Sequence, residues 1–192
     1  MPTAYQSAYI TGLGHYLPGE PVGNDDMDAY VAPLNRASRR IKQRILAENG
    51  IRTRHYAIGP DGRTRESHAR LAAEAIRACL RSASSELDAV SLLAVGSSGG
   101  DALMPGFANM IQGELGAPPM QTLSSQGICV AGVSALEFAA QAVELGSHAR
   151  ALAVGVDMPS RMFKHSRFGP AGYDVDFDAH FLRWMLSDGA GA

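Results

Sequence analysis

The chain has 192 residues, of which 46% are hydrophobic and 19% charged, a profile that predicts one globular domain with a hydrophobic core. A formal net charge of −2 argues against a nucleic-acid partner. Two cysteines are too few for a disulfide framework or a zinc site, so we expect no metal and a reducing, cytoplasmic location. Residues 1–8 lack the layout of a signal peptide, and no apolar run approaches the roughly 20 residues that span a bilayer, so no membrane partner is expected.

The first predicted elements surround a basic segment. Residues 8–14 alternate apolar and small side chains and predict a strand. Asn24, followed by two aspartates, predicts a helix start. Residues 34–47 predict a short basic helix that ends at Gly50, and residues 51–58 predict an extended segment.

The next elements are more apolar. Residues 66–84 place apolar side chains, Cys79 among them, at helical spacing and predict a long helix. Residues 90–95 fit a buried strand, and residues 105–115 fit a helix with Pro105 near its first turn.

A strand–helix–strand unit follows. Residues 120–124 predict a strand, residues 129–145 a helix, and residues 150–156 another strand, which together indicate a crossover in a partly parallel sheet. The polar residues of this helix form one narrow stripe, so we expect it to be buried on most sides. They are Ser134, Glu137, Gln141 and Glu144.

Cys129 is the candidate nucleophile. In the first turn of a helix it would face the positive end of the helix dipole and unpaired backbone N–H groups, which favour the thiolate and can hold an oxyanion. The small neighbours Gly127, Ala131 and Gly132 would let a substrate approach. The alternative is a structural cysteine in a buried helix, the role we expect for Cys79. The pattern assigns no general base, so both readings of Cys129 stay open at this point.

Residues 126–136 (QGICVAGVSAL) resemble the active-site segment of the β-ketoacyl-acyl-carrier-protein synthase III enzymes of the thiolase superfamily. Other segments fall in the family's order at matching spacings, and the similarity covers nearly the whole chain. They are residues 10–18, 50–55, 93–96, 105–116, 153–157 and 188–192.

The resemblance implies a fold and an assembly. The fold is a thiolase-like α/β fold, with a mixed five-stranded sheet sandwiched by helices. Residues 1–192 would form the amino-terminal half of two pseudo-repeated halves, with the carboxyl-terminal half absent from this chain. The family also implies a homodimer and no cofactor.

The resemblance also implies an activity in fatty-acid or secondary-metabolite biosynthesis. An acyl group passes from a thioester, on acyl carrier protein or coenzyme A, to Cys129, and is condensed with a malonyl unit on a carrier protein. The family's catalytic His and Asn belong to the second half, so the six histidines here are expected to be surface or hydrogen-bonding residues.

Further site residues follow from the same resemblance. Met104 lies where a family residue reaches across the dimer to line the partner's acyl pocket; the alternative is a loop methionine that fills a gap in the core. Ala131 aligns with a family glycine beside the nucleophile. Arg44 and Glu48 lie where the family holds the coenzyme A nucleotide, and Glu48 would repel a phosphate, which favours a carrier protein or an unusual donor over coenzyme A.

Two alternatives concern partners and reaction. Arg39, Arg40 and Arg44 belong to a basic region that would attract an acidic carrier protein; the alternative is an ordinary solvated helix face. For the reaction, the alternatives are acyl transfer to an oxygen or nitrogen acceptor without condensation, and a non-catalytic partner subunit of the same fold.

Overall fold

The computed structural model describes residues 5–164 and 177–192. The chain divides into two compact units, each built from discontinuous segments. Unit 1 consists of Met1–Tyr16, Ser67–Asp157 and Gly189–Ala192, and unit 2 of Leu17–Glu66 and Met158–Asp188.

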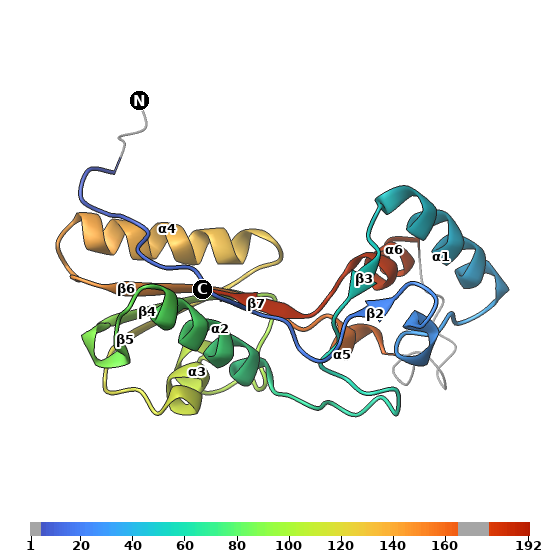
Figure 1. Ribbon diagram of the computed structural model, residues 1–192, viewed down its shortest axis with the longest axis horizontal. Coiled ribbons are helices and arrows are strands. Elements are labelled where there is room, and N and C mark those ends of the chain that lie inside the picture. Colours follow the sequence, from blue (N-terminus) through green and yellow to red (C-terminus); the bar gives the residue numbers. More distant parts are fainter. Residues whose placement is uncertain (1–4, 165–176) are drawn as a thin grey trace. The chain divides into compact units, whose positions relative to one another are not determined.

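Unit 1 is built on a mixed five-stranded sheet, as expected (Figure 1). Its strands are β1 (His15–Tyr16), β4 (Leu92–Ser97), β5 (Gln121–Gln126), β6 (Ala151–Asp157) and β7 (Gly189–Gly191), in the order β1-β7-β6-β4-β5. β4 pairs in parallel with both β5 and β6, whereas β7 is antiparallel to β6 and to β1. Every residue of the interior strand β4 is buried, which accounts for its apolar composition.

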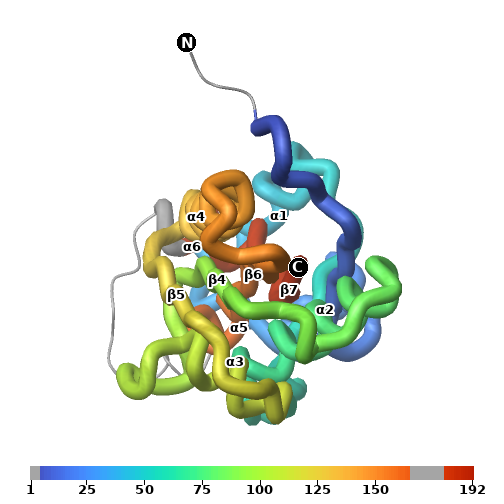
Figure 2. Tube along the Cα trace, turned by 90° about the vertical axis from the view of Figure 1, so that its left-hand side faces the viewer, coloured from blue at the N-terminus to red at the C-terminus, as the bar shows by residue number. Residues whose placement is uncertain are grey.

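Helices cover both faces of this sheet. α4 (Val130–Glu144) packs on β4, β5 and β6. On the opposite face lie α2 (His68–Ser82) and α3 (Phe107–Leu115), as Figures 1 and 2 show. A short 3₁₀ turn, η2 (Leu87–Ala89), leads into β4. The expected parallel crossovers are therefore confirmed.

The prediction that the helix over residues 129–145 is buried on most sides is wrong for this chain. Only Ala131, Ala135 and Ala139 of α4 are buried, whereas Val133 is 65% exposed and Leu136 is 45% exposed. The three alanines recur every four residues and so share one helix face. The sheet packs against that face alone, which leaves the opposite apolar face uncovered.

Near the amino terminus, two predictions need correction and a third holds. Residues 8–14 form no strand; the strand in this region is β1, which follows them. Just before β1, Gly14 exchanges two 2.9 Å backbone hydrogen bonds with Ala192. Asn24 starts no α-helix; the nearest helical element is the 3₁₀ turn η1 (Met27–Ala29). Residues 51–58 are extended or irregular, in agreement with the prediction, and contain the strand β3 (Thr53–Arg54), antiparallel to β2 (Val22–Gly23).

Unit 2 packs α1 (Arg36–Asn49) and α6 (Phe177–Met185) together, with the one-turn α5 (Ser160–Phe163). The Asn35 side chain caps α1, accepting a hydrogen bond from the Ser38 N–H, and Gly50 ends α1 at φ 69°, as predicted. An apolar cluster fills the interior of the unit. It consists of Val22, Met27, Val31, Ile45, Tyr56, Ile58 and Trp184.

Candidate active site

Cys129 lies at the junction between β5 and α4, where the sequence predicts a nucleophile. It is the N-cap residue of α4, one position before the first helical residue, and has right-handed backbone angles (φ −63°, ψ −24°). Its free thiol belongs to an exposed residue. The structural reading, a cysteine buried in the helix interior, therefore does not hold for Cys129.

Cys79 contrasts with Cys129. It is a free cysteine on the buried face of α2, and burial raises the pKa of its thiol. A raised pKa disfavours the thiolate that nucleophilic attack requires. The expected structural role of Cys79 agrees with this environment.

Glycines let the start of α4 rest directly on the sheet. A Cβ atom at Gly96 of β4 would lie 2.1 Å from the carbonyl oxygen of Ala131, a distance no side chain tolerates. A Cβ atom at Gly132 would lie 3.4 Å from the Cα of Gly155 in β6. The first turn of α4 therefore packs against the backbones of both strands, and this close packing fixes the position of Cys129 relative to the sheet.

Polar groups at the strand ends hold the turn before Cys129. The N–H of Gly127 donates to the carbonyl oxygen of Ser97 at 3.1 Å, and the Gln126 side chain donates to the Ser98 carbonyl oxygen at 3.4 Å. An Asp157 oxygen in turn accepts from the N–H of Ser98 at 2.9 Å and from its hydroxyl. No sequence pattern indicated a role for Ser97, Ser98 or Asp157 in the site, although each lies at or just after the carboxyl end of a predicted strand.

The two predicted substrate-binding residues lie in different environments of unit 1. Ala131 is buried, and its carbonyl oxygen faces Gly96. Met104 is 83% exposed in the segment between β4 and α3, next to the fully exposed Leu103. Met104 therefore does not fill a gap in the core of this chain.

The predicted docking arginines lie on α1, in unit 2, and differ in their partners. Arg44 pairs with Glu48 at 3.2 Å, and Arg39 lies 3.9 Å from Asp28, which also binds Lys42 at 2.6 Å. For Arg40 the described part of the chain supplies no hydrogen-bonding or ionic partner.

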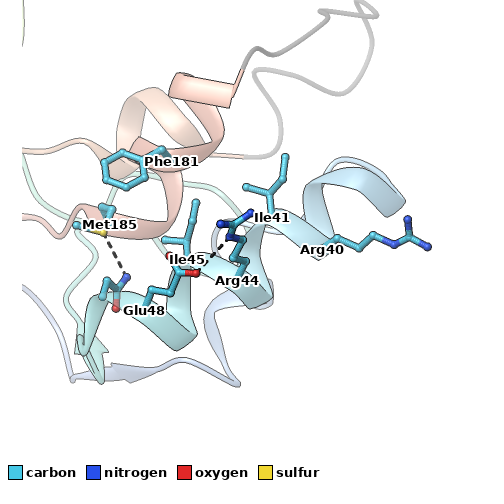
Figure 3. A pocket seen from close by; sticks show the side chains of 8 residues that line it. Arg40, Ile41, Arg44, Ile45, Glu48, Phe181 and Met185 are labelled. Carbon is cyan, nitrogen blue, oxygen red and sulfur yellow. Dashed lines mark hydrogen bonds and ion pairs between the residues drawn. The ribbon is translucent and has the colours of Figure 1, made fainter.

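A groove of about 660 Å³ runs between α1 and α6 beside these arginines. Apolar side chains from both helices form its floor, and Arg40, Arg44 and Glu48 lie on the α1 side (Figure 3). The floor residues are Ile41, Ile45, Phe181 and Met185. Figure 3 also shows Arg40 extending outward from the groove.

The histidines are held in several ways. His148 bonds Ser91 and Gln121, both at 2.8 Å, as expected for a local hydrogen-bonding role. His180 is buried and also hydrogen-bonded, with its Nδ1 3.3 Å from the Ser38 hydroxyl. His68 is buried rather than at the surface, and His165 lies outside the described residues. Within the described ranges no group of His, Cys, Asp and Glu side chains is arranged to hold a metal ion, and no helix is long and apolar enough to cross a bilayer.

Comparison with known proteins places this geometry in context. No protein-family model matches the chain. The chain is 30% identical over 185 residues to the β-ketoacyl-[acyl-carrier-protein] synthase III of Cereibacter sphaeroides, a match that covers 96% of this chain and 50% of that protein. The chain is homologous to half of a β-ketoacyl-acyl-carrier-protein synthase III.

Solved structures agree with this relation. The 3-oxoacyl-(acyl carrier protein) synthase III of Pseudomonas aeruginosa PAO1 matches with TM-score 0.70 and 25% identity, over 97% of this chain and 50% of that one. AbyA1, a tetronic acid condensing enzyme, matches with TM-score 0.76 and 27% identity, over 94% of this chain and 52% of that one. The thiolase-like α/β fold is confirmed, and the chain spans about half the length of the synthase III relatives.

Proposed function

We propose that the chain is the amino-terminal half of a condensing acyltransferase of the synthase III type, with Cys129 as the acyl-accepting nucleophile. The exposed Cys129 at the N-cap of α4 carries this proposal, because a thiolate there meets the positive end of a fifteen-residue helix. The homology to synthase III enzymes supports the same reaction class.

The first half-reaction needs only groups near Cys129. The thiolate attacks the carbonyl carbon of an acyl thioester, and backbone N–H groups at the start of α4 stabilise the oxyanion that forms. Collapse of the tetrahedral intermediate breaks the donor's C–S bond and releases its thiol after protonation. The acyl group is left on Cys129.

In the second half-reaction a malonyl unit on a carrier protein loses CO₂, and the resulting carbanion attacks the acyl-cysteine carbonyl and displaces the Cys129 thiolate. We assign the acid–base groups of this step to the family's second half. We also propose a cytoplasmic homodimer in which the exposed Met104 lines the partner's acyl pocket. The buried Ala131 would contribute its backbone, rather than its methyl group, to the substrate site.

For the donor we favour acyl carrier protein over coenzyme A. The Glu48 carboxylate occupies Arg44 at 3.2 Å, so an incoming phosphate would meet a neutralised pair. Arg40 and, after release from Asp28, Arg39 would instead pair with carboxylates of an acidic carrier protein. The apolar floor of the adjacent groove gives such a protein a surface to bury.

Charge reversal tests this docking. Arg40→Glu should weaken binding of a fluorescently labelled acyl carrier protein about tenfold at low salt, and the difference should shrink as salt screens it. Arg81→Glu, which reverses an exposed arginine in the last turn of α2, is the matched control. Equal affinities of the two variants for the carrier protein would show that α1 is not the docking surface.

The chemistry is tested by mass spectrometry of the intact chain after incubation with acyl-carrier-protein and coenzyme A thioesters. We expect one acyl adduct on the wild-type chain and none on Cys129→Ser. Absence of an adduct with every donor would favour the non-catalytic subunit. Release of the acyl group to an alcohol or amine, without a malonyl unit, would favour transfer without condensation.

A further inference from the structure

We infer that Asp157 is a positioning residue for Cys129, and that it acts through the bend formed by Ser97 and Ser98. The inference rests on the proposed role of Cys129 as the nucleophile. The Asp157 carboxylate bonds the Ser98 backbone rather than Cys129. It therefore fixes the backbone that presents the thiol.

The Asp157 carboxylate closes the gap between two strand ends. Asp157 is the last residue of β6 and Ser97 is the last residue of β4, and these parallel strands are neighbours in the sheet. One carboxylate oxygen accepts from the N–H of Ser98 at 2.9 Å and from the Ser98 hydroxyl. The Ser97 hydroxyl lies 3.4 Å from the same oxygen, but its single proton is donated to the Gly99 carbonyl oxygen at 2.5 Å. The two Ser98 donors on a single oxygen fix the backbone where the chain leaves β4.

The same bend holds the segment that leads to Cys129. The carbonyl oxygen of Ser97 accepts from the N–H of Gly127, two residues before Cys129, and that of Ser98 accepts from the Gln126 side chain. A continuous chain of hydrogen bonds therefore joins the ends of β6, β4 and β5. Of the three strands, β5 is the one that continues into the nucleophile.

The two ends of the turn are thus fixed independently. The glycine contacts of Gly96 and Gly155 fix the start of α4, and the Asp157 network fixes the exit from β5. Cys129 lies between these two fixed points. Loss of the carboxylate leaves the Ser98 donors without their acceptor, and the Ser97 and Ser98 carbonyls lose the support that aligns them with Gly127 and Gln126.

Positioning and simple electrostatics predict opposite results. A carboxylate near a thiolate disfavours the thiolate, so removal of its charge alone would raise the reactivity of Cys129. Loss of positioning would lower that reactivity, because the thiol would no longer be aligned with the start of α4. The sign of the change therefore separates the two roles.

The test is the rate at which iodoacetamide alkylates Cys129 in the 192-residue chain. Asp157→Ala should slow alkylation about tenfold, and Ser98→Ala should slow it by roughly threefold. Asp157→Asn should stay within about twofold of wild type, because its amide oxygen can still accept from Ser98. Asp88→Ala, which removes an exposed aspartate from η2 in the same unit, is the control and should react as wild type.

The buried Cys79 reports on folding in the same experiment. Trypsin separates the two cysteines, since Arg77 and Arg81 flank Cys79 and the next basic residue is Arg150, beyond Cys129. Slow alkylation of Cys129 with Cys79 still protected supports the inference. If Cys79 is also alkylated in Asp157→Ala, that variant has lost its fold, and the alkylation rate of Ser98→Ala decides the inference instead.

Wild-type or faster alkylation of Cys129 in a folded Asp157→Ala or Ser98→Ala chain would overturn the inference. The proposed function fails separately, by the absence of an acyl adduct on a Cys129 that alkylates normally. The two failures are distinguishable because alkylation requires neither an acyl donor nor a second half.

Discussion

At the scale of single residues, Glu144 ties the start of the chain to the end of α4. Its carboxylate accepts hydrogen bonds from the backbone N–H groups of Gln6, Ser7 and Ala8 at 3.0, 2.8 and 3.0 Å. These bonds favour the ionised carboxylate and hold the pKa of Glu144 below its usual value. A depressed pKa means that the contact stabilises the folded chain above the unfolded-state pKa, and that the stabilisation is lost as pH falls through the folded-state pKa.

We therefore predict that Glu144→Gln accelerates hydrogen exchange at residues 6–8 at neutral pH. Wild type should approach the variant only below about pH 4, where the carboxylate becomes protonated. Exchange measured by mass spectrometry over this pH range is the test. Identical protection of residues 6–8 in the two chains at neutral pH would contradict the prediction.

Gly96 lacks a side chain at the point where the first turn of α4 packs against β4. Gly96→Ala places a methyl group 2.1 Å from the Ala131 carbonyl oxygen, so α4 must lift from the sheet. We expect a loss of about 3 kcal/mol or more in the free energy of unfolding, measured by urea denaturation.

Gly113→Ala is the matched control. Gly113 lies inside α3, and nothing lies within 4 Å of its Cβ position, so alanine there should stabilise by about 0.5–1 kcal/mol. Equal stabilities of the Gly96→Ala and Gly113→Ala chains would contradict the proposed contact.

The residues of the site differ in how far the sequence could predict them. A local signal, a small-residue turn followed by a helical pattern, made Cys129 a candidate, and the resemblance of residues 126–136 to synthase III enzymes assigned it as the nucleophile. Ser98 and Asp157 act together only because β4 and β6 are neighbours, and they are 59 residues apart in the chain. Nothing in the sequence around either residue records that pairing.

At the scale of elements, those with a local sequence signal were predicted better than those that depend on a distant partner, for the same reason. The start and end of α1 follow from its own residues, Asn35 and Gly50, whereas β1 exists because it pairs with β7 near the other end of the chain. The exposed face of α4 could not be predicted either, because an apolar pattern shows that a face is suited to burial but not what covers it.

The cap of α1 gives an element-scale prediction. Asn35→Ala removes the 2.8 Å bond to the Ser38 N–H and should lower the free energy of unfolding by about 1 kcal/mol. Asn35→Asp keeps an acceptor and should cost much less. Urea denaturation of the two variants is the measurement, and equal losses would argue against the cap.

At the scale of the whole molecule, an apolar surface on unit 1 stands out. The uncovered face of α4 carries Val130, Val133 and Leu136, and exposed Tyr9, Ile10 and Leu13 precede β1. Exposed apolar area of this kind favours association. We predict that the isolated chain self-associates, and that Val133→Lys with Leu136→Lys reduces the association.

Sedimentation velocity over a concentration series measures this effect. Gln141→Lys, on the polar stripe of the same helix, is the control for added charge and should associate as wild type. Unchanged association of the double variant would show that this face is not the contact.

The architecture of the whole molecule was predicted in part. The α/β class follows from the order of the predicted elements, whereas the mixed five-stranded sheet was implied by the family resemblance; both are confirmed. The division into two compact units was not predicted, because each unit is assembled from segments that are far apart in the sequence.

Peptide mapping after incubation with an acyl-carrier-protein thioester shows whether Cys129 accepts the acyl group. We expect acylation of the tryptic peptide that ends at Arg150 and contains Cys129, and no acylation of the short peptide that contains Cys79. An acyl group on Cys79, or on neither peptide while iodoacetamide still alkylates Cys129, would contradict this expectation.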